Sequence, residues 1–386
     1  MFDPEEVAEL RRAVQQRVLA DRRLFDDVCA DVQKLKGAVR AVKPRSVTAV
    51  SLVASDGGNN AVDFDPFHLQ VVRIVDSYGK KLLTEVVSAG TDPEELGRAQ
   101  FHADGRPRTA LGVMMRDLGV STLHELSPMI PSSEDFRRED RQISPSWVQV
   151  FRELAEWAVL YNLICHSEFG SDTLIVRDGL LRSKVFNGGL LMKWRDRVKA
   201  AIARAATESR RNIYLVGIAK RSNVIDRYNL AIAAERLFPP GEAYYVRVPR
   251  EIEMKAYKWL EWARGVEAAG SGGEGPKFNI GDLYLVRFGA RVGDPIWAVD
   301  LLSDQSDKAS TIFGYLLADA LDGFPVPFYP RCLQRAHEHA QLGGFDFDLL
   351  QEGVFESIRA LLPSGRAEAV DEIRLRADLL AGRYQQ

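Results

Sequence analysis

The sequence predicts a mixed α/β fold, with helices flanking a sheet that carries an antiparallel meander on one side. Three observations support this fold class. Three apolar, β-branched runs follow one another directly between residues 47 and 90, which favours neighbouring antiparallel strands. Two further apolar runs each follow a segment of helical periodicity, and a last pair near residue 290 has hairpin spacing. This order of elements is typical of a mixed sheet.

The size and composition of the chain are those of a globular protein with a full core. Its 386 residues allow one large domain with insertions or two domains; 46% of them are hydrophobic and 27% are charged. No apolar stretch approaches the roughly 20 residues that span a bilayer, and the first residues lack the pattern of a secretory signal. The three cysteines, Cys29, Cys165 and Cys332, are too scattered for a metal knuckle or a disulfide framework. We therefore expect a reduced, cytoplasmic protein without membrane association.

The net charge does not identify a class of partner. It is −3, from 51 Lys and Arg against 54 Asp and Glu, whereas nucleic-acid binders are often strongly basic. A nuclease needs only a local basic groove, which acidic metal ligands and outer surfaces can cancel in the total. Nucleic-acid binding therefore stays open.

The chain begins with a segment of helical spacing. Apolar residues recur at helical intervals from residue 4 to about residue 40, and Asp3 and Pro4 form an N-cap and first-turn pair. The sequence predicts a long helix within an arm of residues 1–45, whose charged face suits contact with solvent or with a second copy. The main domain is expected over residues 46–355, and a helical tail over 356–386.

The main domain divides into alternating strands and helices. Its polar, proline-punctuated segment 91–146 is expected to be a helical insertion. In chain order, the expected elements are strands at 47–58, 69–79 and 81–90, the insertion, a helix at 147–165, a strand at 173–181, a basic amphipathic helix at 193–211, a strand at 212–222, a flexible loop at 265–279, a hairpin of 282–289 and 294–302, and helices from about residue 305.

Two aspartates occupy equivalent positions in this pattern. Asp56 follows an apolar strand and precedes Gly57 and Gly58, and Asp178 closes the apolar strand before Gly179. For either one alone, an ordinary Asp-Gly turn is the commoner explanation. Two such strands in one sheet could bring both carboxylates together, and clustered carboxylate oxygens are what Mg²⁺ or Mn²⁺ requires.

Three further segments carry candidate residues for the same site. The helix before Asp178 carries Glu153 and Glu156, of which Glu156 is preferred, although most helix glutamates are solvated. Lys220, after its strand, has the charge to neutralise a phosphate, and a surface lysine is an equally good explanation. His337 and His339 are two residues apart on a helix and therefore point to different faces, so only one of them would be a metal ligand or proton shuttle.

Common nucleotide and hydrolase motifs are absent from the sequence. It contains no GxxxxGK[ST], no strand-linked GxGxxG and no GxSxG, so ATPase, dinucleotide-binding and serine-hydrolase functions lack their main signal. An acid pair would also suit a glycosidase, but the Asp-Gly strand ends and Lys220 fit phosphate chemistry better.

Several pieces of the chain, in this order, resemble the NurA nuclease family. The pieces are SLVASDGG around Asp56, RELAEWAVL, LIVRDGLL around Asp178, VGIAKRS around Lys220, YLVRF with its following strand, and YPRCLQRAHEHA around His337. They extend from about residue 47 to residue 355. The family's first motif commonly reads Asp-Gly-Ser, and Gly58 replaces the serine here.

The resemblance implies a fold, an activity and partners. The fold is RNase H-like, and the enzyme is a deoxyribonuclease that uses two Mn²⁺ (or Mg²⁺) ions on single- and double-stranded DNA. The expected activity is a 5′–3′ exonuclease, with or without endonuclease activity, in DNA end processing. The expected assembly is a homodimer that partners a hexameric HerA-type ATPase and translocase.

The resemblance also implies roles for individual residues. Asp56, a helix acid (Glu156 or Glu153) and Asp178 would bind the metal ions, and Lys220 and His337 would complete the site, His337 as a further ligand. Family members also use a tyrosine, which the resemblance does not place in this chain. The alternative of a different class is a non-catalytic subunit that keeps a degenerate nuclease fold for DNA binding or translocase docking.

Overall fold

The computed structural model describes most of the chain. It covers residues 3–46, 50–64, 67–137, 144, 146–256, 278–341, 343–363, 366 and 372, without the side chains of residues 50–51, 55–68, 344–345 and 347. The expected flexible loop at 265–279 lies mostly outside the described residues, as does most of the expected tail at 356–386. Within these ranges, none of the helices has the length and apolar character needed to cross a bilayer.

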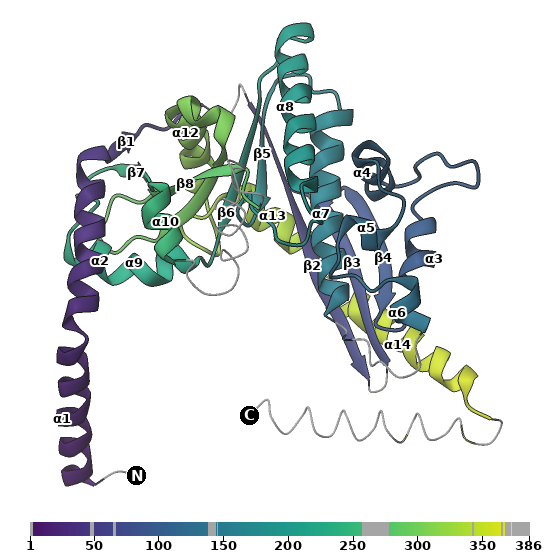
Figure 1. Ribbon diagram of the computed structural model, residues 1–386, viewed down its shortest axis with the longest axis horizontal. Coiled ribbons are helices and arrows are strands. Elements are labelled where there is room, and N and C mark those ends of the chain that lie inside the picture. Colours follow the sequence, from purple (N-terminus) through teal and green to yellow (C-terminus); the bar gives the residue numbers. More distant parts are fainter. Residues whose placement is uncertain are drawn as a thin grey trace.

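A mixed sheet forms the centre of the molecule (Figure 1). In the described part of the chain it has nine strands in the order β1-β7-β8-β9-β6-β5-β2-β3-β4. Their bounds are β1 Arg40–Val42, β2 Val50–Phe64, β3 Phe67–Asp76, β4 Lys81–Ser88, β5 Asp172–Asp178, β6 Ile213–Ala219, β7 Ala243–Arg247, β8 Gly281–Arg287 and β9 Ile296–Leu302.

The pairing of the strands confirms the mixed α/β class and the meander. β2, β3 and β4 are consecutive antiparallel neighbours, and β8 and β9 form the expected antiparallel pair. β2, β5 and β6 run parallel to one another at the centre of the sheet. β1 and β7, which lie at one edge and pair with each other, are not among the strands that the sequence predicts.

The end of the first strand was predicted wrongly. β2 does not stop at Gly57 and Gly58; it continues to Phe64, and its register with β3 is unbroken from Ser55 to Phe64. The glycine pair was read as a turn because glycine is common there, but an antiparallel neighbour of matching length outweighs that local preference. Asp56 therefore lies within a strand.

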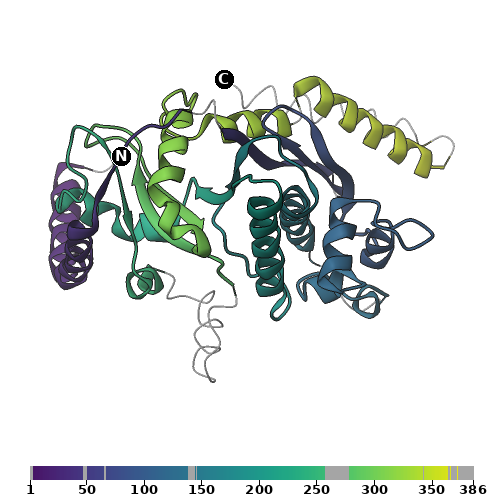
Figure 2. The same ribbon diagram turned by 90° about the horizontal axis from the view of Figure 1, so that it is seen from above.

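Helices cover both faces of the sheet. Their bounds are α1 Pro4–Ala20, α2 Arg22–Leu35, α3 Pro93–Arg98, α4 Ala110–Leu118, α5 Leu123–Leu126, α6 Ser133–Arg137, α7 Trp147–His166, α8 Leu190–Glu208, α9 Asn223–Ala234, α10 Arg250–Ala256, α12 Ala309–Ala320, α13 Arg331–Ala340 and α14 Gly344–Leu361. Figure 2 shows α7 and α8 on one face of the central strands, with α13 and α14 on the other.

Three apolar clusters hold these layers together. The first joins α4, α7 and α8 to β3, β4 and one face of β5, with Trp157 and Trp194 in edge contact at its centre. The second packs α12 and α13 against the opposite face of β5, β6, β8 and β9. The third places α2, α9 and α10 over β8 and β9. The two faces of β5 thus belong to different cores, which fixes where its alternate side chains point.

The single long N-terminal helix that the sequence predicts is two helices. α1 ends at Ala20 and α2 begins at Arg22, with Asp21 between them. Asp3 caps α1 as expected, and its carboxylate accepts a hydrogen bond from the Glu6 N–H at 2.8 Å. α1 buries no residue, whereas α2 packs on α9. Of these two helices, α1 extends away from the body (Figure 1).

The insertion at 91–146 is helical in its described part. It contains α3, α4, α5 and α6, and α4 packs against α7 through Met114, Met115 and Leu118. The segment therefore adds a helical layer beside the meander. The predicted domain boundaries at residues 45 and 355 stay predictions.

Candidate active site

Asp178 occupies the carboxyl end of β5, as the sequence predicts. Gly179 follows with φ of +111°, a conformation that side chains disfavour and that turns the chain out of the strand. The turn is packed tightly against β6. A Cβ atom on Gly217 would lie 2.4 Å from the Gly179 carbonyl oxygen. Glycine at both positions therefore lets the backbone leave β5 directly after the carboxylate.

Two side chains from distant parts of the chain hold the Asp178 carboxylate. Lys220, the residue after β6, places its Nζ atom 2.9 Å from Oδ2. Tyr329, just before α13, donates its hydroxyl to Oδ1 at 3.1 Å. The Asp178 side chain is 20% exposed and that of Lys220 is 38% exposed, so this carboxylate and ammonium face solvent in part.

Tyr329 is the functional candidate that sequence reasoning did not place. Its side chain is fully buried, its ring lies 4.9 Å from the Trp297 ring, and the Lys220 ammonium lies 5.2 Å from its centre. The available signal was its position as the first residue of the YPRCLQRAHEHA piece. A buried tyrosine whose hydroxyl reaches a carboxylate fixes the orientation of that carboxylate.

Asp56 lies beside Asp178 in the backbone register. The parallel pairing of β2 with β5 runs from Val50 opposite Asp172 to Ser55 opposite Arg177. One further step along both strands brings Asp56 and Asp178 opposite each other, and neighbouring strands are about 4.8 Å apart. The side chain of Asp56 lies outside the described part of the structure, so this placement of Asp56 rests on its backbone alone.

The helix acids contact other partners. Glu156 lies 3.7 Å from the Arg177 guanidinium and 3.5 Å from that of Arg152. Arg177 precedes Asp178 in β5 and its guanidinium stacks over Trp157 in the first cluster, so Glu156 is on the opposite face of the sheet from the Asp178 side chain. Glu153 accepts a hydrogen bond from Ser183 at 2.6 Å. The described contacts do not bring either glutamate to Asp178.

His337 and Lys220 line the same cavity. Its volume is about 580 Å³, and α13 forms one of its walls. His337 is exposed and lies 2.8 Å from the Gln341 side chain. The ring of His339 lies instead against Gly79, at the turn between β3 and β4. The two histidines therefore point in different directions, as the sequence predicts.

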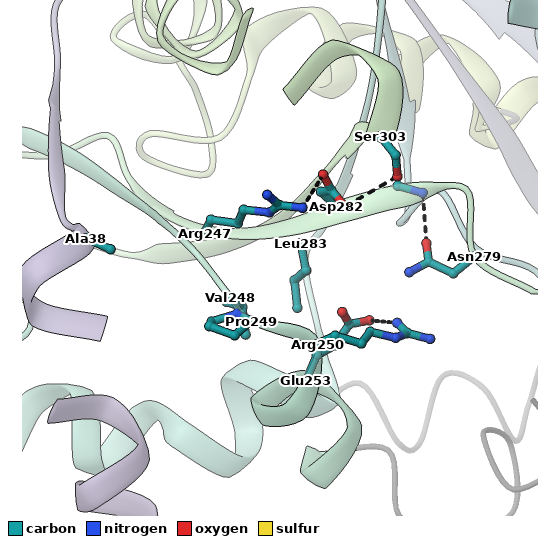
Figure 3. A pocket seen from close by; sticks show the side chains of 11 residues that line it. Ala38, Arg247, Val248, Pro249, Arg250, Glu253, Asn279, Asp282, Leu283 and Ser303 are labelled. Atoms are coloured by element: carbon teal, nitrogen blue, oxygen red, sulfur yellow. Dashed lines mark hydrogen bonds and ion pairs between the residues drawn. The ribbon is translucent and has the colours of Figure 1, made fainter. Parts of the chain in front are cut away.

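A second cavity, of about 410 Å³, lies at the opposite end of the sheet near the start of β8 (Figure 3). Arginines pair with both of its lining carboxylates, at 2.7 Å for Arg247 and Asp282 and at 2.8 Å for Arg250 and Glu253. Both carboxylates of this cavity are therefore already paired with a positive charge. The cavity is thus a weaker candidate for a metal site than the end of β5.

Asp300, in β9, has a structural role. It is fully buried and accepts hydrogen bonds from the Leu181 N–H at 3.0 Å and from the Arg182 guanidinium at 2.9 Å. The same arginine reaches Glu253 at 2.6 Å. A buried carboxylate satisfied in this way holds the segment after β5 against β9.

The described side chains contain no group of three or more His, Cys, Asp or Glu residues placed to hold a metal ion. The Asp56 carboxylate is not among the described side chains. The donor chemistry at the end of β5 nevertheless suits a hard cation. Asp178 already has a cationic ammonium against one oxygen, and each carboxylate oxygen has two lone pairs, so the hydrogen bond from Tyr329 leaves room for a metal ion.

Comparisons with known proteins give similarities at low sequence identity. No protein-family model and no curated protein matches the chain. Among solved structures, the chain is similar to the NurA nuclease from Sulfolobus solfataricus, with 14% identity, coverage of 94% of this chain and 99% of that one, and a TM-score of 0.38.

Two other solved structures named NurA are similar as well. One has 11% identity, coverage of 87% and 93%, and a TM-score of 0.40. The other, a NurA bound to dAMP and manganese, has 11% identity, coverage of 89% and 94%, and a TM-score of 0.34. In its sequence pieces and in these comparisons alike, this chain is similar to NurA nucleases.

Proposed function

We propose that the chain is a metal-dependent deoxyribonuclease whose centre is the carboxyl end of β5. The observation that carries the proposal is the Asp178 carboxylate held between Lys220 and Tyr329, with Asp56 opposite Asp178 on the parallel neighbour β2, one step beyond the pair Ser55 and Arg177. Paired carboxylates with an adjacent ammonium suit the binding of a divalent cation and a phosphodiester. The RNase H-like assignment of the fold belongs to this proposal.

The orientation of Asp56 follows from the strand pattern. Ala54 in β2 and Val176 in β5 are buried in the same apolar cluster, each two residues before one of the aspartates. Side chains two residues apart in a strand share a face. The proposal therefore directs both carboxylates to the face covered by α13, where they would hold Mn²⁺ or Mg²⁺, two ions in the full site.

The residues around the carboxylates have distinct tasks. When bound, the metal would supply positive charge to the phosphodiester oxygens that become negative in the transition state. The partly exposed Lys220 adds a second cation there and orients the phosphate as a point charge. Tyr329 holds Asp178 in one orientation, since its hydroxyl is fixed by a fully buried ring.

The remaining expected ligands, Glu156 and His337, stay in the proposal on the strength of the sequence resemblance. His337 lines the cavity beside Lys220. Glu156 pairs with Arg177 on the other face of β5, so it would have to leave that pair and pass the end of the strand to reach the same ion. The sequence resemblance is also the basis for proposing a 5′–3′ direction of degradation, a homodimer and a HerA-type ATPase partner. The solved NurA bound to dAMP and manganese makes Mn²⁺ the first ion to try.

The second candidate function is a non-catalytic subunit that binds DNA or docks a translocase. One observation favours it: the described contacts pair Glu156 with Arg177 and not with the Asp178 site. A chain that lacks the third acid at its metal site would keep its fold and its DNA-binding surface without hydrolysis.

Degradation of end-labelled linear DNA separates the two functions. With Mn²⁺ or Mg²⁺, the purified wild-type chain should shorten the DNA, EDTA should stop it, and Asp56→Ala and Asp178→Asn should each reduce the rate by at least about 100-fold, because each removes a ligand. Asp196→Asn is the matched control, since Asp196 is exposed on α8 and pairs only with its neighbour Arg195 among the described contacts.

Full activity in both site variants would refute the assignment of the site. A folded wild-type chain that binds DNA and stays inactive with every ion, also in the presence of a HerA-type partner, would favour the non-catalytic subunit.

A further inference from the structure

The cavity beside Lys220 continues the proposed active site. Lys220 both lines this cavity of about 580 Å³ and contacts Asp178. The other walls are α13 and the segment 321–330 that precedes it. This space is therefore open to a molecule that has a phosphodiester at Asp178.

An aromatic side chain stands exposed at the cavity. Phe324 is 83% exposed, and its neighbour Val326 is 37% exposed. Both line the cavity together with Pro325. Since folding gains little from an exposed phenyl ring, the ring is free to contact a ligand.

The segment that carries Phe324 is held firmly. The buried side chain of Gln334 accepts a hydrogen bond from the Val326 N–H at 2.9 Å and donates to the carbonyl oxygens of Val326 and Tyr329, both at 2.9 Å. A Cβ atom on Gly323 would lie 2.4 Å from the Tyr329 carbonyl oxygen. The exposure of Phe324 is thus not the result of a loose loop.

The same segment is tied to the catalytic carboxylate. Tyr329, which Gln334 braces, donates its hydroxyl to Asp178. The ring of Phe324 is therefore set at a defined place relative to Asp178. An aromatic ring fixed in this way can bind a flat ligand without losing conformational entropy of its own.

The charges of the cavity fit a polyanion. Its lining includes three cations, Lys220, Arg331 and Arg335, and two carboxylates, those of Asp322 and Glu338; Lys220 pairs in addition with Asp178. The Arg331 guanidinium lies 3.9 Å from Asp322, both groups being well exposed, so this contact does little to neutralise it. An apolar, aromatic surface beside two arginines matches a nucleotide, which has a flat base and an anionic phosphate.

We propose that Phe324 stacks on an unpaired base of the DNA strand whose phosphodiester lies at Asp178, while Arg331 and Arg335 contact phosphates of that strand. This inference rests on the proposed function and adds the form of the substrate. A base inside a duplex is covered on both faces by its neighbours, so only a single-stranded or opened end offers a free face to Phe324.

Binding of a fluorescent single-stranded oligonucleotide to the full chain in EDTA tests the stacking without cleavage. Phe324→Ala should weaken binding about 5- to 100-fold, the range for loss of one base–aromatic stack, and Phe324→Trp should preserve it. Leu321→Ala is the matched control, because Leu321 is 55% exposed in the same segment and does not line the cavity; it should bind as the wild type does.

A series of oligonucleotides with one abasic position each then locates the base. At one position, the missing base should weaken binding by the wild type as much as Phe324→Ala weakens binding of the intact oligonucleotide. The Phe324→Ala protein should bind that abasic oligonucleotide as well as it binds the intact one. Unchanged binding by Phe324→Ala, or equal losses in both proteins at every abasic position, would overturn the inference. If the wild type still cleaves the oligonucleotide with Mn²⁺, only the stacking fails; a wild type that neither binds nor cleaves refutes the proposed function as well.

Discussion

Tyr329 links the proposed catalytic carboxylate to the core of the protein. Its ring is fully buried against Trp297, and its hydroxyl donates to Asp178 at 3.1 Å. Tyr329→Phe keeps the ring and removes the hydroxyl that makes this hydrogen bond. We expect DNA cleavage to slow by about 10- to 100-fold, because a carboxylate free to rotate is poorly placed, while the free energy of unfolding falls by only about 1–2 kcal/mol.

Steady-state cleavage rates and urea unfolding of the same preparations check this prediction. Tyr315→Phe is the matched control, since Tyr315 packs in the same cluster on α12, next to Tyr214. Wild-type rates in Tyr329→Phe would show that the hydroxyl does not position Asp178.

At this scale the sequence predicts residue types better than contacts. Asp178 and Lys220 meet because Asp178 ends β5 and Lys220 follows its parallel neighbour β6. The pattern of apolar strands ending in a polar residue is visible in the sequence. Tyr329 lies 151 residues from Asp178, and no local pattern reports such a contact. The contact of Glu156 with Arg177 is similarly invisible, because helical spacing alone does not say which of Glu153 and Glu156 faces which strand.

At the scale of elements, α2 is attached through a buried carboxylate. Asp31 accepts hydrogen bonds from the Lys255 ammonium at 2.7 Å and from the Lys34 ammonium at 3.1 Å. Burial raises the pKa of Asp31, but the hydrogen bonds and the positive charges of these two lysines together outweigh burial, and its pKa lies below the usual value. Its stabilising contribution is therefore present above the pKa of an unfolded aspartate, about 3.9, and is lost as the pH falls through the lower folded value.

Asp31→Asn should lower the free energy of unfolding at pH 7 by about 1–3 kcal/mol, since it leaves the Lys255 ammonium without its partner. The difference from the wild type should shrink below about pH 4. Urea unfolding at pH 7 and at pH 3 measures both values, with Asp26→Asn as the exposed control on the same helix. A difference that stays constant over this range would show that the charge of Asp31 is not its source.

The elements themselves follow the sequence where periodicity is strong. The predicted helix at 147–165 and the strand at 212–222 match α7 and β6 closely. The prediction and the structure differ at the end of β2 and at the break between α1 and α2. At both places the local sequence pattern does not report how the segment packs. Glycines can continue a strand when a partner strand pairs with them, and one residue at Asp21 suffices to end a helix that buries nothing.

At the scale of the whole molecule, the order of strands brings the candidate site together. β2 and β5 are separated by the meander, the helical insertion and α7, yet they are parallel neighbours at the centre of the sheet. The mixed class and the meander are predictable from the spacing of apolar runs. The edge formed by β1 and β7 is not predictable from the sequence, because strands of three and five residues are too short to show a periodic pattern.

The central claim is that Asp56 and Asp178 hold the same divalent ion. Calorimetric titration of Mn²⁺ into the wild type, Asp56→Asn, Asp178→Asn and the double variant tests it directly. Each single change should weaken binding at least about tenfold, and the double variant should bind little more weakly than the worse single variant, because two ligands of one ion are strongly coupled. Additive losses, or wild-type affinity in either single variant, would contradict the shared site.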